Sequence, residues 1–209
     1  ARIQPGDEPF RVKAPMRSLL THERLMLNVM QRMSGIATAT RQVVDRLEGT
    51  DCRLLDTRKT TPLFRHLEKW AVQIGGGINH RFGLFDMVMI KDNHVDFAGG
   101  IVPAIEKVNA YLTLHSLDLK IEVETRNLDE VQQAVDTGVI DRILLDNMPP
   151  VALKEAVKLI DGRCETEASG GIKPENAREF AESGVDFISM GALTHQVQSL
   201  DISFKAVVQ

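Results

Sequence analysis

The chain repeats one pattern of hydrophobic and polar positions. A short apolar run ends at a polar residue or a glycine, a loop follows, and a stretch with helical periodicity comes next. Each run is predicted to be a strand, because it is short and is bounded by turn residues. The six runs cover residues 54–55, 87–90, 121–123, 143–145, 165–168 and 187–190, and the helical stretches lie near residues 64–74, 100–112, 127–137, 149–160 and 174–183.

Strands that alternate with helices and read as continuous apolar runs indicate a parallel sheet that is covered on both faces. The later runs recur at an almost constant spacing. This favours a barrel related to the eight-stranded α/β type over an open doubly wound sheet. No Gly-x-Gly-x-x-Gly motif follows the first run, which weakens the dinucleotide-binding alternative. The predicted fold class is therefore α/β, with a parallel barrel.

A longer helix precedes the first run. Its periodic positions extend from Thr21, the predicted N-cap, to about Glu48, and Gly49 follows as a stop. Residues 1–20 differ from this helix, because a Pro-Gly-Asp turn signal and further prolines break them into short pieces. We expect this segment to be the tail of an absent domain or a docking arm, since it cannot bury a core alone.

Composition narrows the class of protein. The net charge of −4 gives no overall positive field, so nucleic acid and anionic membranes are not expected partners. The longest apolar runs are too short to cross a bilayer, and no signal-peptide pattern is present. Cys52 and Cys164 are the only cysteines, which favours a reducing, cytoplasmic location without a disulfide framework.

The candidate chemistry follows the runs. In parallel barrels the active site lies at the carboxyl ends of the strands, and each run here ends at a residue that can react or let a phosphate approach. Arg81 adds a further cation to this region, so positive charge is concentrated in a chain that is acidic as a whole. The ring predicted at the mouth consists of Asp56, Thr57, Arg58, Lys59, Lys91, Glu124, Asp146, Ser169, Gly170, Gly171 and Gly191.

Two carboxylates stand opposite these cations. Glu124 and Asp146 lie one strand–helix unit apart. Such a pair suits magnesium held partly through water, or the stabilisation of a developing sugar cation. A structural ion pair with Lys59 or Lys91 is the alternative.

Glycine-containing loops close the last two units. Residues 169–172 and 190–193 expose backbone N–H groups where barrels of this type commonly bind a phosphate. The residues alone therefore predict an α/β barrel that binds a multiply anionic substrate, a phosphate ester with magnesium.

Several longer motifs are specific enough for comparison with a known family. Asp-Thr-Arg-Lys-Thr at 56–60 and Ile-Lys-Asp-Asn-His at 90–94 are long and uncommon. These motifs resemble those of the quinolinate phosphoribosyltransferases, and the resemblance covers residues 8–205 in order. Further matching stretches lie at 23–24, 31–38, 56–62, 75–81, 122–124, 145–147, 169–172 and 191–195.

The resemblance implies that a phosphoribosyl group passes from phosphoribosyl pyrophosphate to quinolinate with decarboxylation. The products are nicotinate mononucleotide, pyrophosphate and carbon dioxide, a step of NAD biosynthesis. It implies Mg²⁺, no organic cofactor, and a homodimer with shared active sites. It also implies an open, incomplete TIM-like barrel of about seven strands and an N-terminal α/β sandwich domain. Residues 1–20 would then be the tail of that mostly absent domain, 21–200 the catalytic barrel, and 201–209 a segment returning to the N-terminal domain.

The resemblance also assigns site residues. Lys59, Glu124 and Asp146 match the phosphoribosyl pyrophosphate and magnesium positions and are the catalytic candidates, with Glu124 and Asp146 as the metal ligands. Quinolinate would be bound by Arg24 of the neighbouring subunit together with Arg58, His80, Arg81 and Lys91. The remaining substrate-binding candidates are Thr57, Ser169, Gly170, Gly171, Met190, Gly191, Ala192 and His195.

Departures from the family pattern concern loops. Leu63 stands where glycine is usual, Gln196 where serine is common, and Arg126 where some members have aspartate. Three alternatives stay open: a paralogous phosphoribosyltransferase for another base such as nicotinate, a catalytically silent truncated homologue, and a Schiff-base aldolase that uses Lys59 or Lys91. The number of cations in the quinolinate set argues for a dianionic base.

Overall fold

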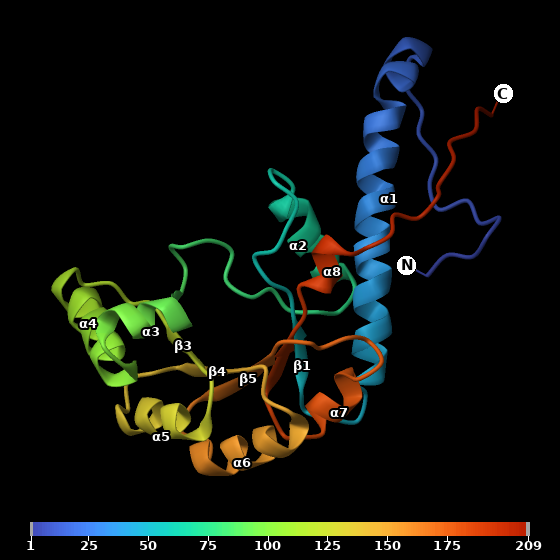
Figure 1. The fold of residues 1–209 in the computed structure, drawn as a ribbon. Helices are drawn as coiled ribbons and strands as arrows, with labels where there is room; N and C mark the ends of the chain where they lie inside the picture. Colours follow the sequence, from blue (N-terminus) through green and yellow to red (C-terminus); the bar gives the residue numbers. More distant parts are fainter. Residues whose placement is uncertain (1, 208–209) are drawn as a thin grey trace.

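Strands and helices alternate along the chain, as the sequence predicts (Figure 1). The structure is a computed structural model and describes residues 2–207. Its strands are β1 (Arg53–Leu55), β2 (Val88–Ile90), β3 (Ile121–Thr125), β4 (Arg142–Asp146), β5 (Glu165–Ser169) and β6 (Phe187–Ser189). Its helices are α1 (Met16–Arg46), α2 (Arg65–Ile74), α3 (Asp92–Ala98), α4 (Ile101–Leu114), α5 (Leu128–Asp136), α6 (Pro150–Ile160), α7 (Ala177–Ala181) and α8 (Ala192–His195).

The strands form one parallel sheet in the order β1-β6-β5-β4-β3-β2. A single bridge joins Leu55 of β1 to Ile78, while the same residue pairs with Ser189 of β6 on its other side. The barrel is therefore open between Ile78 and β2, where residues 79–87 form the connection. The prediction of an open, incomplete α/β barrel is confirmed, with six strands and the Ile78 bridge where about seven strands are expected.

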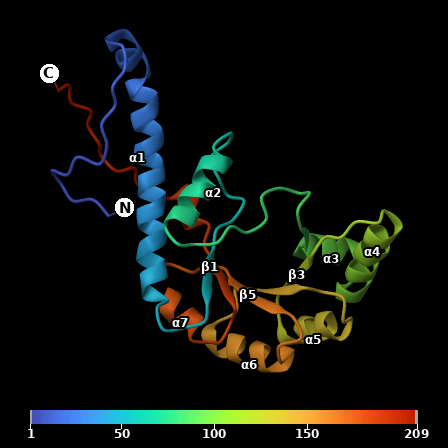
Figure 2. The same ribbon diagram turned by 180° about the vertical axis from the view of Figure 1, so that it is seen from behind.

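Helices cover the outer face of this sheet. Contacts between neighbours run from α4 through α5, α6 and α7 to α1 and α2, and both views show α5 and α6 along one side of the strands (Figures 1 and 2). The hydrophobic core lies between these helices and the sheet, and Val123, Ile143 and Ile188 are completely buried in it. Removal of this apolar surface from water is the main force that holds the two layers together.

The inner face of the barrel is polar, although the strands read as continuous apolar runs in the sequence. Side chains alternate across a strand. In β3, Val123 belongs to the hydrophobic core, whereas Glu122 is buried on the opposite face. Arg142 Nη1 of β4 lies 3.2 Å from Glu167 Oε2 of β5, and its guanidinium stacks on Phe187 at 4.2 Å. The buried charges are tolerated because they neutralise one another.

The long helix α1 begins earlier than predicted. It starts at Met16, and Thr21, the predicted cap, lies inside it and donates its hydroxyl to Arg17 O. Pro15 disfavours helical backbone at the residue before it, so the helix begins directly after the proline. None of the helices that the structure describes is long and apolar enough to cross a membrane.

The N-terminal half of α1 projects beyond the barrel (Figure 1). The arm before the helix and the C-terminal segment run beside it, and the rings of Phe10 and Phe204 stack with their centroids 6.2 Å apart. The division of the chain at residues 20 and 200 stays a prediction.

Two short helices, α3 and α8, were not predicted. Each follows a strand almost directly and is too short to show a clear period in the sequence. A third helix, α7, begins at Ala177 rather than near residue 174. The reason is a preceding turn, in which Asn176 Oδ1 accepts the Lys173 N–H at 2.7 Å.

Candidate active site

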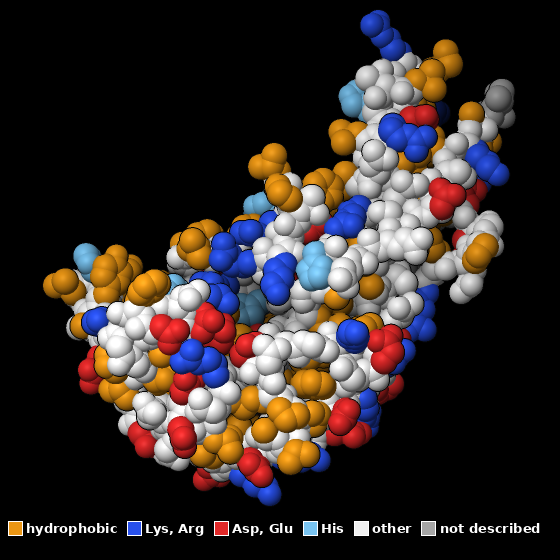
Figure 3. Space-filling model, viewed as in Figure 1, with side chains coloured by type: hydrophobic (Ala, Val, Ile, Leu, Met, Phe, Trp, Pro, Cys, Tyr) orange, Lys and Arg blue, Asp and Glu red, His pale blue; other side chains and the backbone are white. Residues whose placement is uncertain are grey.

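The carboxyl ends of the strands meet at one edge of the sheet. Asp146 at the end of β4 pairs with Ser169 at the end of β5, and Ile90 of β2 pairs with Val123 of β3. The residues that follow these strands therefore share one mouth with loop 57–61 after β1, as the sequence predicts. We call residues 57–61 the cation loop and residues 191–195 the phosphate loop. Basic side chains gather in the hollow between α3 and α8 (Figure 3).

Two arginines at the mouth have unusual surroundings. Arg58 Nε is buried and has no hydrogen-bond partner within residues 2–207. Burial lowers the pKa of Arg81, and the positive charge of Arg58 lowers it further. Arg81 is held by Met87 O, which accepts from Nη1 at 3.3 Å. Because neighbouring guanidinium groups repel one another, this pair is suited to an anion that lies between them.

Each of the two predicted acidic residues, Glu124 and Asp146, accepts a hydrogen bond from another side chain. Lys91 Nζ donates to Glu124 Oε2 at 3.1 Å, so the ion pair considered as an alternative is present. The Lys91 side chain is 49% exposed. Such a pair contributes little, about 1 kcal/mol or less, so an anionic ligand can compete for the lysine. Asp146 Oδ2 accepts from Asn147 Nδ2 at 2.6 Å.

The phosphate loop depends on close approach at Gly191. A Cβ at this position would lie 3.0 Å from both Lys59 Cδ and His195 Nε2, so these two side chains converge there. Gly170 is packed against Asn147 in the same way and has a φ of 93°, which other residues rarely adopt. At Gly171, by contrast, no atom lies within 4 Å of the place that a Cβ would take, so the backbone there is open to a ligand such as a phosphate.

His80 lies below the mouth, in the barrel interior. Its Nε2 is 3.0 Å from Glu122 Oε2 and 3.3 Å from Glu167 Oε2. Burial by itself would lower the pKa of His80, but the two carboxylates outweigh it and raise the pKa to about 9. Burial also raises the pKa of Glu122. The Arg81 N–H donates to Nδ1 at 2.6 Å, so Nδ1 acts as an acceptor while Nε2 faces the two carboxylates.

Asp56 is buried beneath the mouth and does not line it, which corrects its place in the predicted ring. Its Oδ1 accepts from Lys69 Nζ at 2.5 Å and from the His80 N–H at 2.8 Å, and Lys69 also donates to His80 O at 2.9 Å. Burial raises the pKa of Asp56 and lowers that of Lys69, and the attraction within the pair opposes both shifts. The pair fixes the backbone that carries His80 and Arg81.

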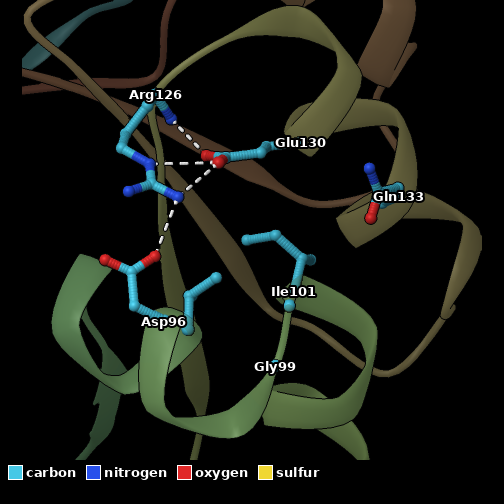
Figure 4. Close-up of a pocket in the computed structure, with 8 residues that line it drawn as sticks. Asp96, Gly99, Ile101, Arg126, Glu130 and Gln133 are labelled. Atoms are coloured by element: carbon cyan, nitrogen blue, oxygen red, sulfur yellow. Dashed lines mark hydrogen bonds and ion pairs between the residues drawn. The ribbon is translucent and has the colours of Figure 1, made fainter.

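A cavity of about 410 Å³ lies between α3 and α5, and none of the predicted site residues lines it (Figure 4). Arg126 crosses this cavity. Its Nη2 is 3.2 Å from Asp96 Oδ1 and 2.8 Å from Glu130 Oε1. Arg126, which departs from the family pattern, therefore forms ion pairs with Asp96 and Glu130 of this chain.

Comparison with known proteins identifies the chain's relatives. Residues 36–205 match the family described as Quinolinate phosphoribosyl transferase, C-terminal domain. The chain belongs to this family. It is 49% identical, over 97% of its length, to the Arabidopsis thaliana protein named nicotinate-nucleotide pyrophosphorylase (carboxylating), chloroplastic, and covers 62% of that protein. It is 44% identical, over 96% of its length, to a Bacillus subtilis protein named as a probable nicotinate-nucleotide pyrophosphorylase (carboxylating), and covers 68% of it.

Solved structures agree with this family membership. NadC from Streptococcus pyogenes is 42% identical and superposes with a TM-score of 0.87, over 92% of this chain and 66% of that one. The Francisella tularensis nicotinate-nucleotide pyrophosphorylase is 44% identical and superposes with a TM-score of 0.84, over 90% of this chain and 65% of that one. The chain thus spans less than two thirds of the length of the plant relative, and its residues 36–205 match the family's C-terminal domain.

The structure adds buried polar residues that the sequence did not reveal as part of the site. Glu122, Glu167 and Arg142 surround His80, and the group of His80 with the two glutamates has the ligand types and spacing of a metal site. The alternation Ile-Glu-Val-Glu at 121–124 was the available signal, because a glutamate at every second strand position indicates a polar inner face. Arg24 is exposed in the N-terminal half of α1. This half projects beyond the barrel that carries the other predicted site residues (Figure 1).

Proposed function

We propose that the protein containing this chain transfers a phosphoribosyl group to quinolinate and releases carbon dioxide, giving nicotinate mononucleotide and pyrophosphate. The observation that supports this most directly is the pair of Arg58 and Arg81 at the mouth, with the buried Arg58 Nε free of a partner in the described chain. Quinolinate carries two carboxylates on adjacent ring carbons, and two guanidinium groups with Lys91 complement such a dianion.

The quinolinate half of the site would also include His80 and Arg24. Since His80 is almost buried, with Nε2 toward Glu122 and Glu167, it would meet the ligand through its remaining exposed edge. Arg24 would come from the other subunit of a homodimer, which agrees with its exposed position on α1. A homodimer with shared sites is part of the proposal.

The phosphoribosyl pyrophosphate half would use Lys59, Glu124 and Asp146 together with the glycine loops. Lys59 and His195 converge at Gly191, where their positive charge and the bare backbone suit phosphate oxygens. The proposed contacts in these loops are Thr57, Ser169, Gly170, Gly171, Met190, Gly191, Ala192 and His195.

The acidic pair fits Mg²⁺ by its chemistry. Glu124 is the penultimate residue of β3, and Asp146 ends the neighbouring strand β4. Both offer carboxylate oxygens, the donors that Mg²⁺ prefers when it keeps part of its water. When bound, Mg²⁺ would offset negative charge on the pyrophosphate and help it to leave. The buried group of His80, Glu122 and Glu167 is less suitable, because Arg142 already occupies one of its carboxylates.

The charged side chains at the mouth would then support each step of the reaction. Departure of pyrophosphate leaves positive charge on the ribose, which Glu124 and Asp146 stabilise. The pyridine nitrogen forms a bond to the ribose and becomes positively charged. This charge stabilises the electron pair left at the adjacent carbon when that carbon's carboxylate departs as carbon dioxide, and a proton takes its place. The arginines keep the ring in position throughout.

The cytoplasmic location stays a prediction. It rests on the low number of cysteines, whereas the Arabidopsis relative is named as chloroplastic.

The proposal is tested by supplying the full-length protein with phosphoribosyl pyrophosphate, Mg²⁺ and either quinolinate or nicotinate. We expect nicotinate mononucleotide to form with quinolinate and not with nicotinate as the base. Removal of Mg²⁺ by a chelator should abolish product formation. Product from nicotinate but not from quinolinate would establish the paralogous alternative, and no product from either base would favour a silent homologue.

A further inference from the structure

One arginine connects three segments behind the proposed site. Arg32 lies in the middle of α1, on the side that meets α2 and α8. We propose that Arg32 is a positioning residue that holds the cation loop and the phosphate loop in register, so that their cations face one phosphoribosyl pyrophosphate molecule. This inference rests on the proposed function and adds a residue to which the family resemblance gives no role.

On one side Arg32 reaches the cation loop through Glu68 of α2. Its Nε and Nη2 donate to Glu68 Oε1 at 3.1 and 2.8 Å. The same carboxylate binds Thr61, accepting the Thr61 N–H at 3.0 Å and the Thr61 hydroxyl at 2.8 Å. The end of the cation loop is thus fixed by a carboxylate whose charge Arg32 balances.

On the other side Arg32 reaches the phosphate loop. Its Nη2 donates to Thr194 O, and its Nη1 donates to Val197 O at 3.2 Å, just after α8. The Thr194 hydroxyl in turn donates to Lys59 O at 2.8 Å. The two loops therefore contact each other directly through Thr194, and Arg32 holds both contacts from behind.

The surroundings make this arginine difficult to replace. The Glu68 side chain is completely buried, so loss of its partner would leave an uncompensated charge inside the protein. The planar fork of arginine serves acceptors on α2 and on the α8 segment at once, whereas a lysine ammonium cannot span them with the same geometry. The Arg32 side chain is mostly buried, at 24% exposure, which restricts it to this conformation.

The connection matters for catalysis because Lys59 and His195 come from different loops and meet at Gly191. A shift of about 1 Å between reacting groups can reduce a rate about 100-fold, even when the mutation lies away from the chemistry. Loss of Arg32 should therefore act on the phosphate half of the site more strongly than on His80 and Arg81 of the quinolinate half, whose backbone Asp56 and Lys69 fix independently. Arg58 of the quinolinate half also lies on the cation loop, but next to Asp56 rather than at the Thr61 end that Glu68 holds.

The test uses the full-length protein and steady-state kinetics with both substrates. We expect Arg32→Gln to reduce kcat/KM for phosphoribosyl pyrophosphate about 100-fold, while the Kd of quinolinate measured alone changes less than about 3-fold. Arg32→Lys should recover part of the loss. The matched control is Arg41→Gln on the same helix, because Arg41 forms an ion pair with the exposed Asp45, and its loss should leave both constants unchanged.

A second variant covers the case in which Arg32→Gln does not fold. Thr194→Val removes the hydroxyl bond to Lys59 O without exposing a buried charge, and should raise the KM of phosphoribosyl pyrophosphate while the Tm stays near the wild-type value. A lower Tm with unchanged kinetic constants in the folded Arg32 variants would overturn the positioning role. If the wild-type protein makes no nucleotide at all, the proposed function fails; if it does and the variants match it, only the role of Arg32 fails.

Discussion

At the scale of single residues, the proposed quinolinate half of the site brings the Arg58 and Arg81 side chains close enough for their charges to repel. Burial and the neighbouring Arg58 both lower the pKa of Arg81, which means that the folded chain holds two cations closer than they would lie in water. An anion that fits between them relieves this repulsion. The same two arginines were visible in the sequence, because each lies in a loop that follows or faces a strand end.

Arg81→Ala should weaken quinolinate binding and leave phosphoribosyl pyrophosphate binding unchanged. The substitution removes a charged hydrogen-bond donor, for which we expect a loss of about 1.5–3 kcal/mol in binding free energy. Isothermal titration of each ligand separately measures the effect. Arg163→Ala, at the opposite end of the barrel, is the control. Equal loss of both affinities would mean that Arg81 serves the other half of the site.

The buried proton around His80 should make stability depend on pH. The pKa of His80 is about 9 in the folded chain, above its ordinary value of 6.5. Protonated His80 therefore contributes fully to the free energy of unfolding below about pH 6.5. This contribution, on the order of 3 kcal/mol, is lost as the pH rises through about 9. Urea unfolding between pH 6 and 10 measures it. His80→Gln should show a flatter profile in this window, and a slope identical to that of the wild type would contradict the assignment.

At the scale of elements, the sequence was informative where local patterns decide the structure. The apolar runs gave all six strands, and the parallel arrangement then placed their carboxyl ends, with Lys91, Glu124 and Asp146, at one mouth. The sequence was uninformative where contacts between residues that are distant in the chain decide the structure. Arg32 and Glu68 look like ordinary helix residues until the packing of α1 against α2 brings them together. A one-dimensional pattern carries no record of such contacts.

The crossing of α1 and α2 depends on Gly75 at the end of α2. A Cβ at this position would lie 2.5 Å from Ala37 O and 2.6 Å from Thr40 Cβ, so the two helices can approach only because the side chain is missing. Gly75→Ala should lower the free energy of unfolding by about 1–3 kcal/mol, the usual cost of overpacking. Gln73→Ala, exposed on the same helix, is the control. Chemical denaturation measures both, and equal stability of the two variants would mean that the crossing can relax.

At the scale of the whole molecule, the exposed position of Arg24 suggests that the site is completed by another subunit. The half of α1 that carries Arg24 projects beyond the barrel and leaves Leu20 and Leu25 66% exposed, an arrangement that suits burial against a second copy of the family's full-length protein. An ordinary surface arginine on this helix is the alternative, and it would contribute no more than about 1 kcal/mol.

Mixing two inactive full-length variants distinguishes these possibilities. Arg24→Ala and Lys59→Ala should each be nearly inactive alone. After subunit exchange, about half of the dimers should be heterodimers with one intact site of two, so activity should recover to roughly a quarter of the wild-type value. No recovery, despite demonstrated exchange, would place Arg24 in its own subunit's site or outside catalysis.

The most direct test of the proposed reaction follows the carboxylate that leaves. Quinolinate labelled at the carboxyl group next to the ring nitrogen is incubated with the full-length protein, phosphoribosyl pyrophosphate and Mg²⁺, and labelled carbon dioxide and nicotinate mononucleotide are measured together. Because the positive ring nitrogen stabilises the departing electron pair, we predict one labelled carbon dioxide for each nucleotide formed, and none without phosphoribosyl pyrophosphate. Nucleotide that retains the label, or carbon dioxide released without phosphoribosyl pyrophosphate, would contradict the proposed reaction.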